Sequence, residues 1–357
     1  MTHEILAFAE GKAGRLRLNR PKAIHALNEP MCRAMIDALV AWRSDPDIEL
    51  VLLDHAPSPD GDPKYSRGFC AGGDVRAVAE SGKGDGVAAR SFFHTEYQLN
   101  HLLFTYAKTV VSFLDGIVMG GGVGIGLPAK YRVATERTMF AMPEATIGLF
   151  PDVGGGWYLS RLPGRLGQYL ALTAARLNGA DAQAVGLATH YLPSDALADV
   201  KTKLASNPRD AEAILDAAST ALPEAPIMAQ CAEIDRLFAA DTLEDILVAL
   251  EADDGEWAEK TLAGLRTKSP QSCKIALRLL REGARRTDFA DEMRAEYGLA
   301  AHVSMRPDFI EGVRALLVDK DNAPVWNPAT PEGVTEAMLD TIFSALPADE
   351  AWQPLRL

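Results

Sequence analysis

Two glycine-rich turns constrain the fold of this 357-residue chain more than any other feature of its sequence. The first spans residues 71–74 (Ala-Gly-Gly-Asp), and the second spans residues 119–124 (Met-Gly-Gly-Gly-Val-Gly). Each turn follows a short apolar run and precedes a segment that we expect to be helical. Glycine at such a junction lets the backbone approach a ligand closely and leaves N–H groups pointing outward at the helix start. Glycine-rich strand–helix junctions are common, and in many of them the glycines only permit a tight turn and close helix packing.

If both turns face the same point, they supply two N–H donors for one oxygen atom, as a developing oxyanion on a carbonyl requires. Neither turn fits a phosphate-binding loop, because no Gly-Lys-Ser or Gly-Lys-Thr follows it. Residues 120–126 have the glycine density of a dinucleotide-binding turn. However, no acidic residue ends a strand about 20 residues later in a clear strand–helix–strand unit.

Strands alternate with helices over roughly the first 195 residues, which indicates an α/β architecture. Residues 4–18 alternate like a strand pair, and the apolar runs 48–53 and 110–114 are typical of buried strands. Apolar side chains recur at helical spacing over residues 29–43. A polar, proline-containing loop is expected at 56–65.

From about residue 196 onward the pattern is helical. Helices are expected at 196–205, 209–219, 228–238, 242–252, 255–266, 270–282, 288–303, 308–317 and 332–344. We therefore predict two regions: residues 1–195 with the candidate site, and residues 196–357 as a helical C-terminal region.

Two acidic residues lie eight positions apart, Glu144 and Asp152, in a segment that is otherwise apolar and rich in Gly and Pro. Carboxyl groups among apolar side chains are partly desolvated, which raises their pKa values. Such a carboxyl group can act as base, acid or nucleophile. Both acids also have a structural alternative. Asp152 can cap a helix beginning near residue 155, and Glu144 can form an exposed ion pair with Arg132 or Arg137.

The overall composition narrows the function classes. The 36 basic and 49 acidic residues give a net charge of −13, which argues against nucleic acid as a general partner. The four cysteines are far apart without CxxC spacing, so neither a disulfide framework nor a zinc site is expected. No run of about 18 apolar residues predicts a membrane-spanning helix. No basic and apolar leader begins the sequence, so we expect a cytoplasmic protein.

Together the motifs resemble the crotonase (enoyl-CoA hydratase/isomerase) superfamily in order and spacing. They are residues 18–23 (Leu-Asn-Arg-Pro-Lys-Ala), 69–74 (Phe-Cys-Ala-Gly-Gly-Asp), 116–122 (Gly-Ile-Val-Met-Gly-Gly-Gly) and 143–144 (Pro-Glu). Within the superfamily, residues 140–156 and 308–321 are most similar to its hydrolases of 3-hydroxyisobutyryl-CoA. The resemblance covers roughly residues 5–344. It implies an α/β, crotonase-like (ClpP/crotonase) ββα spiral core with an extended helical C-terminal region.

The resemblance also implies roles for individual residues. The oxyanion-hole amides match Gly73 and Gly121, and the catalytic carboxylates match Glu144 and Asp152. A further substrate-site acid of the hydrolases matches Glu96. In the same way, Arg20 and Lys22 match the early segment that skirts coenzyme A, although both can also belong to a solvated turn.

Hydratases of the superfamily carry one more glutamate just after the second glycine turn, where this chain has Gly124. The resemblance therefore favours hydrolysis over hydration. Glu144 would attack the carbonyl carbon to give a mixed anhydride or activate a water molecule, and these two roles stay open. Asp152 would bind the 3-hydroxyl group of the substrate or assist proton transfer.

The implied substrate is 3-hydroxyisobutyryl-CoA, an intermediate of valine breakdown, or 3-hydroxypropionyl-CoA. The two differ by one methyl group, a difference that a pocket distinguishes weakly. No cofactor or metal is expected, because coenzyme A is part of the substrate. A homo-oligomer is an open expectation. The alternatives are an enoyl-CoA hydratase or isomerase, and an acyl-CoA-binding protein without catalysis.

Overall fold

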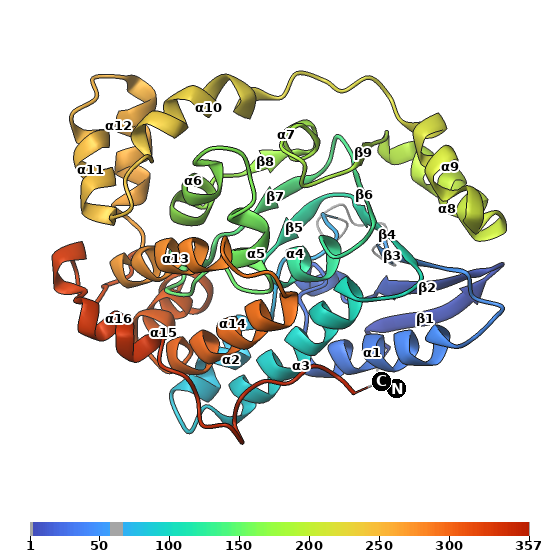
Figure 1. The fold of residues 1–357 in the computed structure, drawn as a ribbon, viewed down its shortest axis with the longest axis horizontal. Helices are drawn as coiled ribbons and strands as arrows, with labels where there is room; N and C mark the ends of the chain where they lie inside the picture. The colour runs from blue at the N-terminus through green and yellow to red at the C-terminus, as the bar shows by residue number, and fades with distance from the viewer. Residues whose placement is uncertain (1–2, 58–66, 357) are drawn as a thin grey trace.

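A six-stranded sheet forms the centre of the computed structural model, which describes residues 3–57 and 67–356 (Figure 1). The strand order is β1-β2-β3-β4-β6-β9. Only β1 and β2 pair antiparallel, and every other neighbouring pair in this sheet is parallel. The strands are β1 (Ile5–Glu10), β2 (Ala13–Leu18), β3 (Leu50–His55), β4 (Thr109–Leu114), β6 (Tyr131–Ala134) and β9 (His190–Tyr191).

A smaller sheet contains the strand that precedes the second glycine turn. It contains β5 (Ile117–Met119), β7 (Met139–Ala141) and β8 (Leu177–Asn178), in the order β5-β7-β8. An isolated parallel bridge joins Cys70 to Val118 of β5. The chain before the first glycine turn therefore lies beside the strand before the second.

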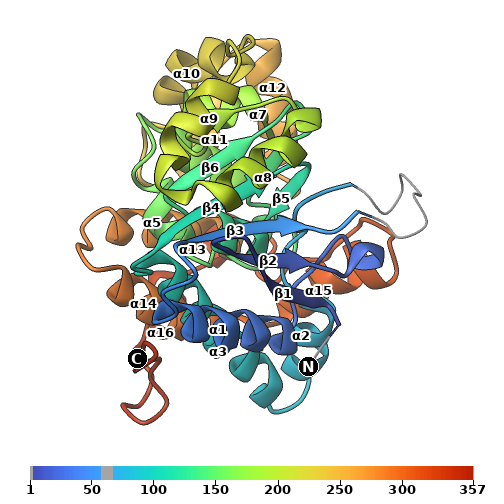
Figure 2. The same cartoon turned by 90° about the vertical axis from the view of Figure 1, so that its right-hand side faces the viewer.

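The helices surround both sheets (Figures 1 and 2). They are α1 (Glu29–Arg43), α2 (Val75–Gly82), α3 (Val87–Phe104), α4 (Gly121–Gly126), α5 (Gly155–Leu159), α6 (Leu166–Thr173), α7 (Gly179–Ala184), α8 (Leu197–Ser206), α9 (Ala211–Ala218), α10 (Pro226–Leu237), α11 (Leu243–Glu251), α12 (Glu256–Leu265), α13 (Pro270–Gly283), α14 (Phe289–Val303), α15 (Pro307–Val313) and α16 (Glu336–Ile342). None of them, within the described residues, is long and apolar enough to cross a membrane.

Both faces of the large sheet are covered. In β3, Leu50 and Leu52 belong to a core shared with α8 and α9, whereas Val51 and Leu53 belong to the core shared with α1 and α3. Figure 2 shows α8 and α9 on one side of the sheet and α1 and α3 on the other. Successive strand residues point to opposite faces, so a strand covered on both sides is apolar at every position.

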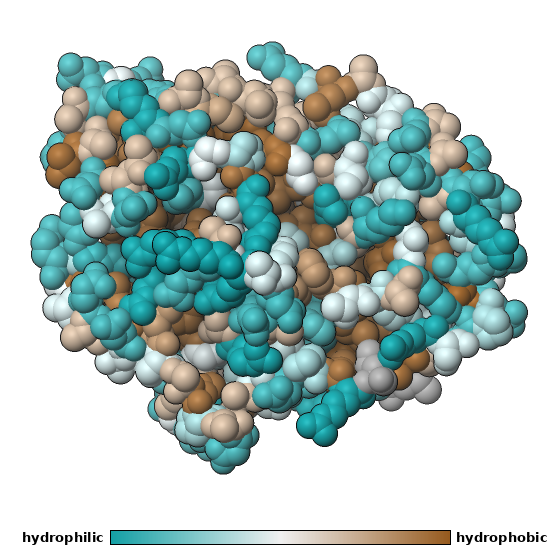
Figure 3. All heavy atoms as spheres, viewed as in Figure 1, coloured by the Kyte–Doolittle hydropathy of each residue, from teal (hydrophilic) through white to brown (hydrophobic). Residues whose placement is uncertain are grey.

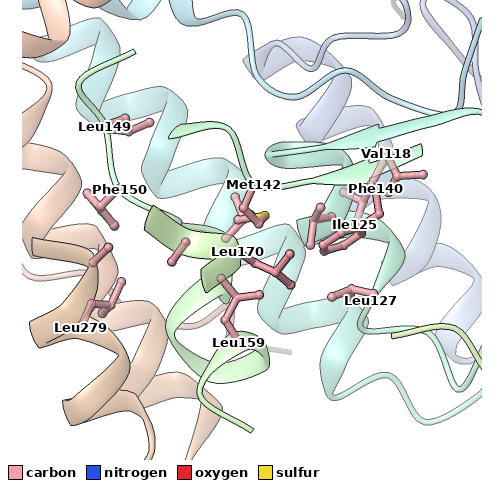
Figure 4. Close-up of a cluster of buried hydrophobic side chains, with 14 of the residues drawn as sticks. Val118, Ile125, Leu127, Phe140, Met142, Leu149, Phe150, Leu159, Leu170 and Leu279 are labelled. Atoms are coloured by element: carbon pink, nitrogen blue, oxygen red, sulfur yellow. The ribbon is translucent and has the colours of Figure 1, made fainter. Parts of the chain in front are cut away.

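The C-terminal helices pack on the same core as the first half of the chain. Figure 4 shows Leu279 of α13 near Phe150, within a cluster that also includes Leu159 of α5 and Met142. α14 packs against α3, and the Trp352 side chain is fully buried in this core. The residues after 195 thus complete the core, and the division into regions 1–195 and 196–357 stays a prediction. The face seen in Figure 3 is mostly hydrophilic, with small hydrophobic areas between.

Several expected elements are confirmed, with bounds that differ by a few residues. The helix expected at 29–43 is α1, and the strand expected at 48–53 is found at 50–55. The helix expected at 308–317 is α15, which continues as a π-helical turn over 314–318. The loop expected at 56–65 falls almost entirely outside the described residues.

Candidate active site

The two glycine turns face each other. Backbone hydrogen bonds between Cys70 and β5 lead directly into both turns. Gly72 and Gly120 have φ values of +116° and +46°, which L side chains rarely adopt. A methyl group added to Gly120 would lie 3.5 Å from the Gly72 Cα, and one added to Gly121 would lie 3.2 Å from the Gly73 nitrogen. The structure thus brings together the predicted oxyanion-hole residues, Gly73 and Gly121.

A cavity of about 480 Å³ opens on these turns. Its lining includes residues 71–73 and 119–121 together with the carboxyl groups of Glu96, Glu144 and Asp152. Such a volume lies in the range of small-molecule sites. Five of the seven predicted site residues therefore line one cavity, although their catalytic roles stay predictions.

Glu144 lies immediately after β7, in a 3₁₀ turn that follows Pro143. Its backbone carbonyl accepts hydrogen bonds from the N–H groups of Ile147 and Leu149, both at 3.0 Å, which fixes the turn. The side chain is 4% exposed, and its Oε2 has no hydrogen-bond partner among the described residues. Burial, reinforced by the nearby Asp152, raises the pKa of Glu144 well above 4.5. The structural alternative for Glu144, an exposed ion pair with Arg132 or Arg137, is therefore wrong, because the carboxyl group lines the cavity instead.

Asp152 is held by a tyrosine that the sequence did not single out. The Tyr97 hydroxyl donates a hydrogen bond to Asp152 Oδ2 at 2.8 Å, and both side chains are buried. Burial raises the pKa of Asp152 to about 7, and the Tyr97 hydrogen bond opposes this rise. Asp152 does not cap α5, because the N-cap residue of this helix is Gly154 and no side chain caps it. Tyr97 directly follows Glu96, and this adjacency to a predicted site residue was the only signal available.

Glu96 belongs to α3, and its side chain lies next to both glycine turns. Its Oε1 would be 2.5 Å from a methyl group added to Gly121, and it has no hydrogen-bond partner among the described residues. Burial raises the pKa of Glu96 well above 4.5, and the charges of Asp152 and Glu144 add to this effect. Burying a carboxyl oxygen without a hydrogen-bond partner lowers the free energy of unfolding.

We expect Glu96→Gln to stabilise the protein at pH 8. The folded-state pKa of Glu96 lies above its ordinary value of 4.5, so its contribution to stability is lost as pH rises above that value. Glutamine carries no charge to bury, so the free energy of unfolding at pH 8 should be higher for the variant than for the parent. Thermal unfolding at pH 8 and pH 5 measures the effect, with a smaller gain at pH 5. Equal or lower stability of the variant at pH 8 would contradict this expectation.

Arg20 and Lys22 do not belong to the residues that line the cavity. Arg20 forms ion pairs with Glu4 and Asp74 and donates to the carbonyl of Ala26. These contacts tie the early segment to the first glycine turn. The coenzyme A role of Arg20 and Lys22 stays a prediction.

Two other cations line the cavity, Arg176 and Lys268. Arg176 is exposed, whereas Lys268 is partly buried and donates to the Thr146 hydroxyl at 3.0 Å. Both are distant in sequence from the glycine turns, so sequence reasoning missed them. These two side chains place positive charge beside the three acidic side chains that line the cavity.

Gly124 lies where the hydratases of the superfamily are expected to carry a second glutamate. A β-carbon at this position would be 2.5 Å from the Val153 Cβ and 2.9 Å from the Asn100 Nδ2. The space is already filled by these two side chains. A glutamate could not be accommodated here without moving its neighbours.

Comparison with known proteins agrees with this geometry. A family model described as enoyl-CoA hydratase/isomerase matches residues 13–343. The curated relatives include the 3-hydroxyisobutyryl-CoA hydrolase, mitochondrial, of Danio rerio, which is 42% identical over 352 residues, 96% of this chain and 90% of the relative. They also include 3-hydroxyisobutyryl-CoA hydrolase 1 of Arabidopsis thaliana, 39% identical over 97% of this chain and 93% of the relative.

Solved structures confirm the predicted crotonase-like fold. A carnitinyl-CoA dehydratase from Mycobacterium thermoresistibile is 40% identical with a TM-score of 0.91, over 97% of this chain and 98% of that chain. An enoyl-CoA hydratase from Rhodobacter sphaeroides 2.4.1 is 35% identical with a TM-score of 0.89, over 98% of this chain and 99% of that chain. The chain belongs to the enoyl-CoA hydratase/isomerase family.

Proposed function

We propose that this chain hydrolyses the thioester of 3-hydroxyisobutyryl-CoA to coenzyme A and the free hydroxy acid. The relatives that carry this activity in their names are about 40% identical over nearly the whole chain. The observation that carries the proposal in the structure is one cavity lined by two facing glycine turns and by the Glu144 carboxyl group, whose Oε2 has no hydrogen-bond partner in the described part of the chain. Breakdown of valine is the metabolic setting that this substrate implies.

The reaction follows from the positions of these groups. The N–H groups of Gly73 and Gly121 bind the thioester oxygen and stabilise the negative charge that develops on it. Gly121 is the first residue of α4, where the backbone N–H groups have no partner within the helix. Glu144 either takes a proton from an attacking water molecule or attacks the carbonyl carbon itself. The carbon–sulfur bond then breaks, and the departing sulfur receives a proton that originates from water, which gives the free thiol. If Glu144 has attacked the carbon itself, a water molecule next hydrolyses the mixed anhydride, which releases the hydroxy acid and restores the Glu144 carboxylate.

Asp152 and the cations complete the proposed site. Asp152, oriented by Tyr97, binds the 3-hydroxyl group or assists proton transfer. Arg176 and Lys268 lie at the cavity and can bind the phosphates of coenzyme A, alongside the predicted Arg20 and Lys22. This arrangement uses no metal or further cofactor.

The pH dependence of hydrolysis should follow the buried acids. Burial raises the pKa of Asp152 to about 7, so this group is ionised above that pH and protonated below it. A protonated carboxyl group cannot accept the substrate proton, so we expect kcat/KM to fall as pH is lowered through about 7. Initial rates between pH 5 and pH 9 measure the profile. A rate that is constant or that increases toward pH 5 would contradict this expectation.

A thiol-release assay tests the proposed function. The chain is incubated with 3-hydroxyisobutyryl-CoA or crotonyl-CoA, and free thiol is followed with a thiol-reactive dye. We expect rapid thiol release from the hydroxyacyl substrate alone. The absence of release, together with loss of the crotonyl-CoA absorbance, would support the hydratase alternative that the names of the two solved structures suggest.

The cytoplasmic location and the homo-oligomer stay predictions, and some of the relatives are named as mitochondrial. Size-exclusion chromatography with light scattering would determine the oligomeric state.

A further inference from the structure

A buried glutamate of α14 holds the turn that follows Asp152. Glu296 Oε2 accepts a hydrogen bond from the Gly154 N–H at 2.7 Å, and its Oε1 accepts one from the Gly156 N–H at 3.0 Å. The Glu296 side chain is fully buried. Both oxygens of one carboxyl group are thus used by the backbone of a single turn, 140 residues away in the sequence.

This turn has a conformation that needs such support. Val153 has a φ of +54°, which is an outlier for a β-branched residue, and Gly154 follows with a φ of +93°. The Val153 side chain is buried against Gly124 and cannot turn away. Strained backbone of this kind persists only where the surrounding structure determines it, and it concentrates at functional sites.

The surroundings of Glu296 leave little freedom for its carboxyl group. Glu292, one helical turn earlier, is also fully buried, and its Oε2 accepts a hydrogen bond from the Arg286 guanidinium at 3.1 Å. Burial raises the pKa of Glu296 well above 4.5, and the charges of Glu292 and Asp152 add to this effect. An acid kept in such a place is costly to stability, so a role beyond packing would explain its presence.

We propose that Glu296 is a positioning residue for Asp152 in the hydrolysis proposed above, on which this inference rests. Tyr97 fixes the Asp152 side chain from α3, and Glu296 fixes the backbone of the adjoining turn from α14. The Asp152 carboxyl group is thereby held toward Glu144 and the two glycine amides. Glu296 itself does not line the cavity and does not touch the substrate.

Glu296→Gln tests the inference with little change in shape. The glutamine oxygen can accept one of the two N–H groups, but its NH₂ group meets the other with donor facing donor. We expect kcat/KM for 3-hydroxyisobutyryl-CoA to fall about 10- to 100-fold, because small displacements of a reacting group cost rates of this order. If this variant does not fold, Glu296→Asp is measured instead, since it keeps the charge but is too short to reach both N–H groups.

Asp181→Asn is the matched control. Asp181 is also buried, and its two oxygens accept from the Ile227 N–H at 2.9 Å and the Asn178 N–H at 3.1 Å. It lies outside the cavity lining. We expect this control to lose thermal stability while kcat/KM stays within twofold of the parent.

The double variant Asp152→Asn/Glu296→Gln separates positioning from general structural damage. If Glu296 acts through Asp152, its loss adds less than threefold once Asp152 is replaced. The inference would be overturned if the two substitutions lower kcat/KM by the product of their separate effects. It would also be overturned if the Glu296→Gln protein is folded and has the parent's kcat/KM. Neither result would affect the hydrolase proposal. A parent chain that releases no thiol would instead overturn the proposed function, and this inference with it.

Discussion

Replacing Glu144 with glutamine is expected to lower kcat for thioester hydrolysis by about 1,000-fold, within the range reported for the loss of a general base. Glutamine has nearly the same shape, but its amide can neither take a proton from water nor attack the carbonyl carbon. Because Glu144 is buried with an unpartnered oxygen, the variant should be at least as stable as the parent. Initial rates of thiol release measure kcat, and thermal unfolding confirms that the variant is folded.

Glu224→Gln is the control for removing one negative charge. Glu224 is exposed in the connection between α9 and α10, and it does not line the cavity. Its replacement should leave kcat unchanged. A Glu144→Gln protein that is folded and retains more than a tenth of the parent's kcat would show that another group drives the reaction.

Replacing Gly121 with alanine is expected to lower kcat by about 100- to 1,000-fold, the usual effect of losing one oxyanion-hole donor. The added methyl group would lie 3.2 Å from the Gly73 nitrogen and 2.5 Å from Glu96 Oε1. It would therefore displace Glu96 and occupy the space in front of the Gly73 N–H group. Steady-state kinetics with 3-hydroxyisobutyryl-CoA, together with thermal unfolding, measures the effect on each property.

Gly264→Ala provides a matched control for this change. Gly264 lies in α12, and a methyl group added there would meet no atom within 4 Å. Alanine favours a helix more than glycine does, so this control should be at least as stable and equally active. If Gly121→Ala is as active as Gly264→Ala, the two glycine amides do not form the oxyanion hole.

The helices were the part of the fold that sequence patterns predicted best. The helices of the C-terminal region bury one face each, and their apolar residues recur at the helical period, as in α13 and α14. The strands β5, β8 and β9 contain only two or three residues, too few for a period to be recognised. They exist because pairing with neighbouring strands, distant in sequence, satisfies their backbone groups.

The candidate site was predictable where the local sequence carries the chemistry. The glycine turns and the two acids of residues 142–157 are short motifs, and the structure brings them to one cavity. Arg176 and Lys268 line the cavity, and Glu296 binds the turn after Asp152, through long-range packing that no local pattern encodes. One signal for Glu296 existed, because Glu292 and Glu296 are four residues apart on the same face of α14 as the buried Met293 and Ala300.

Hydrolysis in ¹⁸O-labelled water tests the central claim most directly. The chain is incubated with 3-hydroxyisobutyryl-CoA in this solvent, and mass spectrometry locates the label in the products. Cleavage of the thioester predicts free coenzyme A and one ¹⁸O atom in the carboxylate of the released acid. Label in the 3-hydroxyl group of an intact thioester, without free coenzyme A, would show reversible dehydration and contradict the hydrolase account.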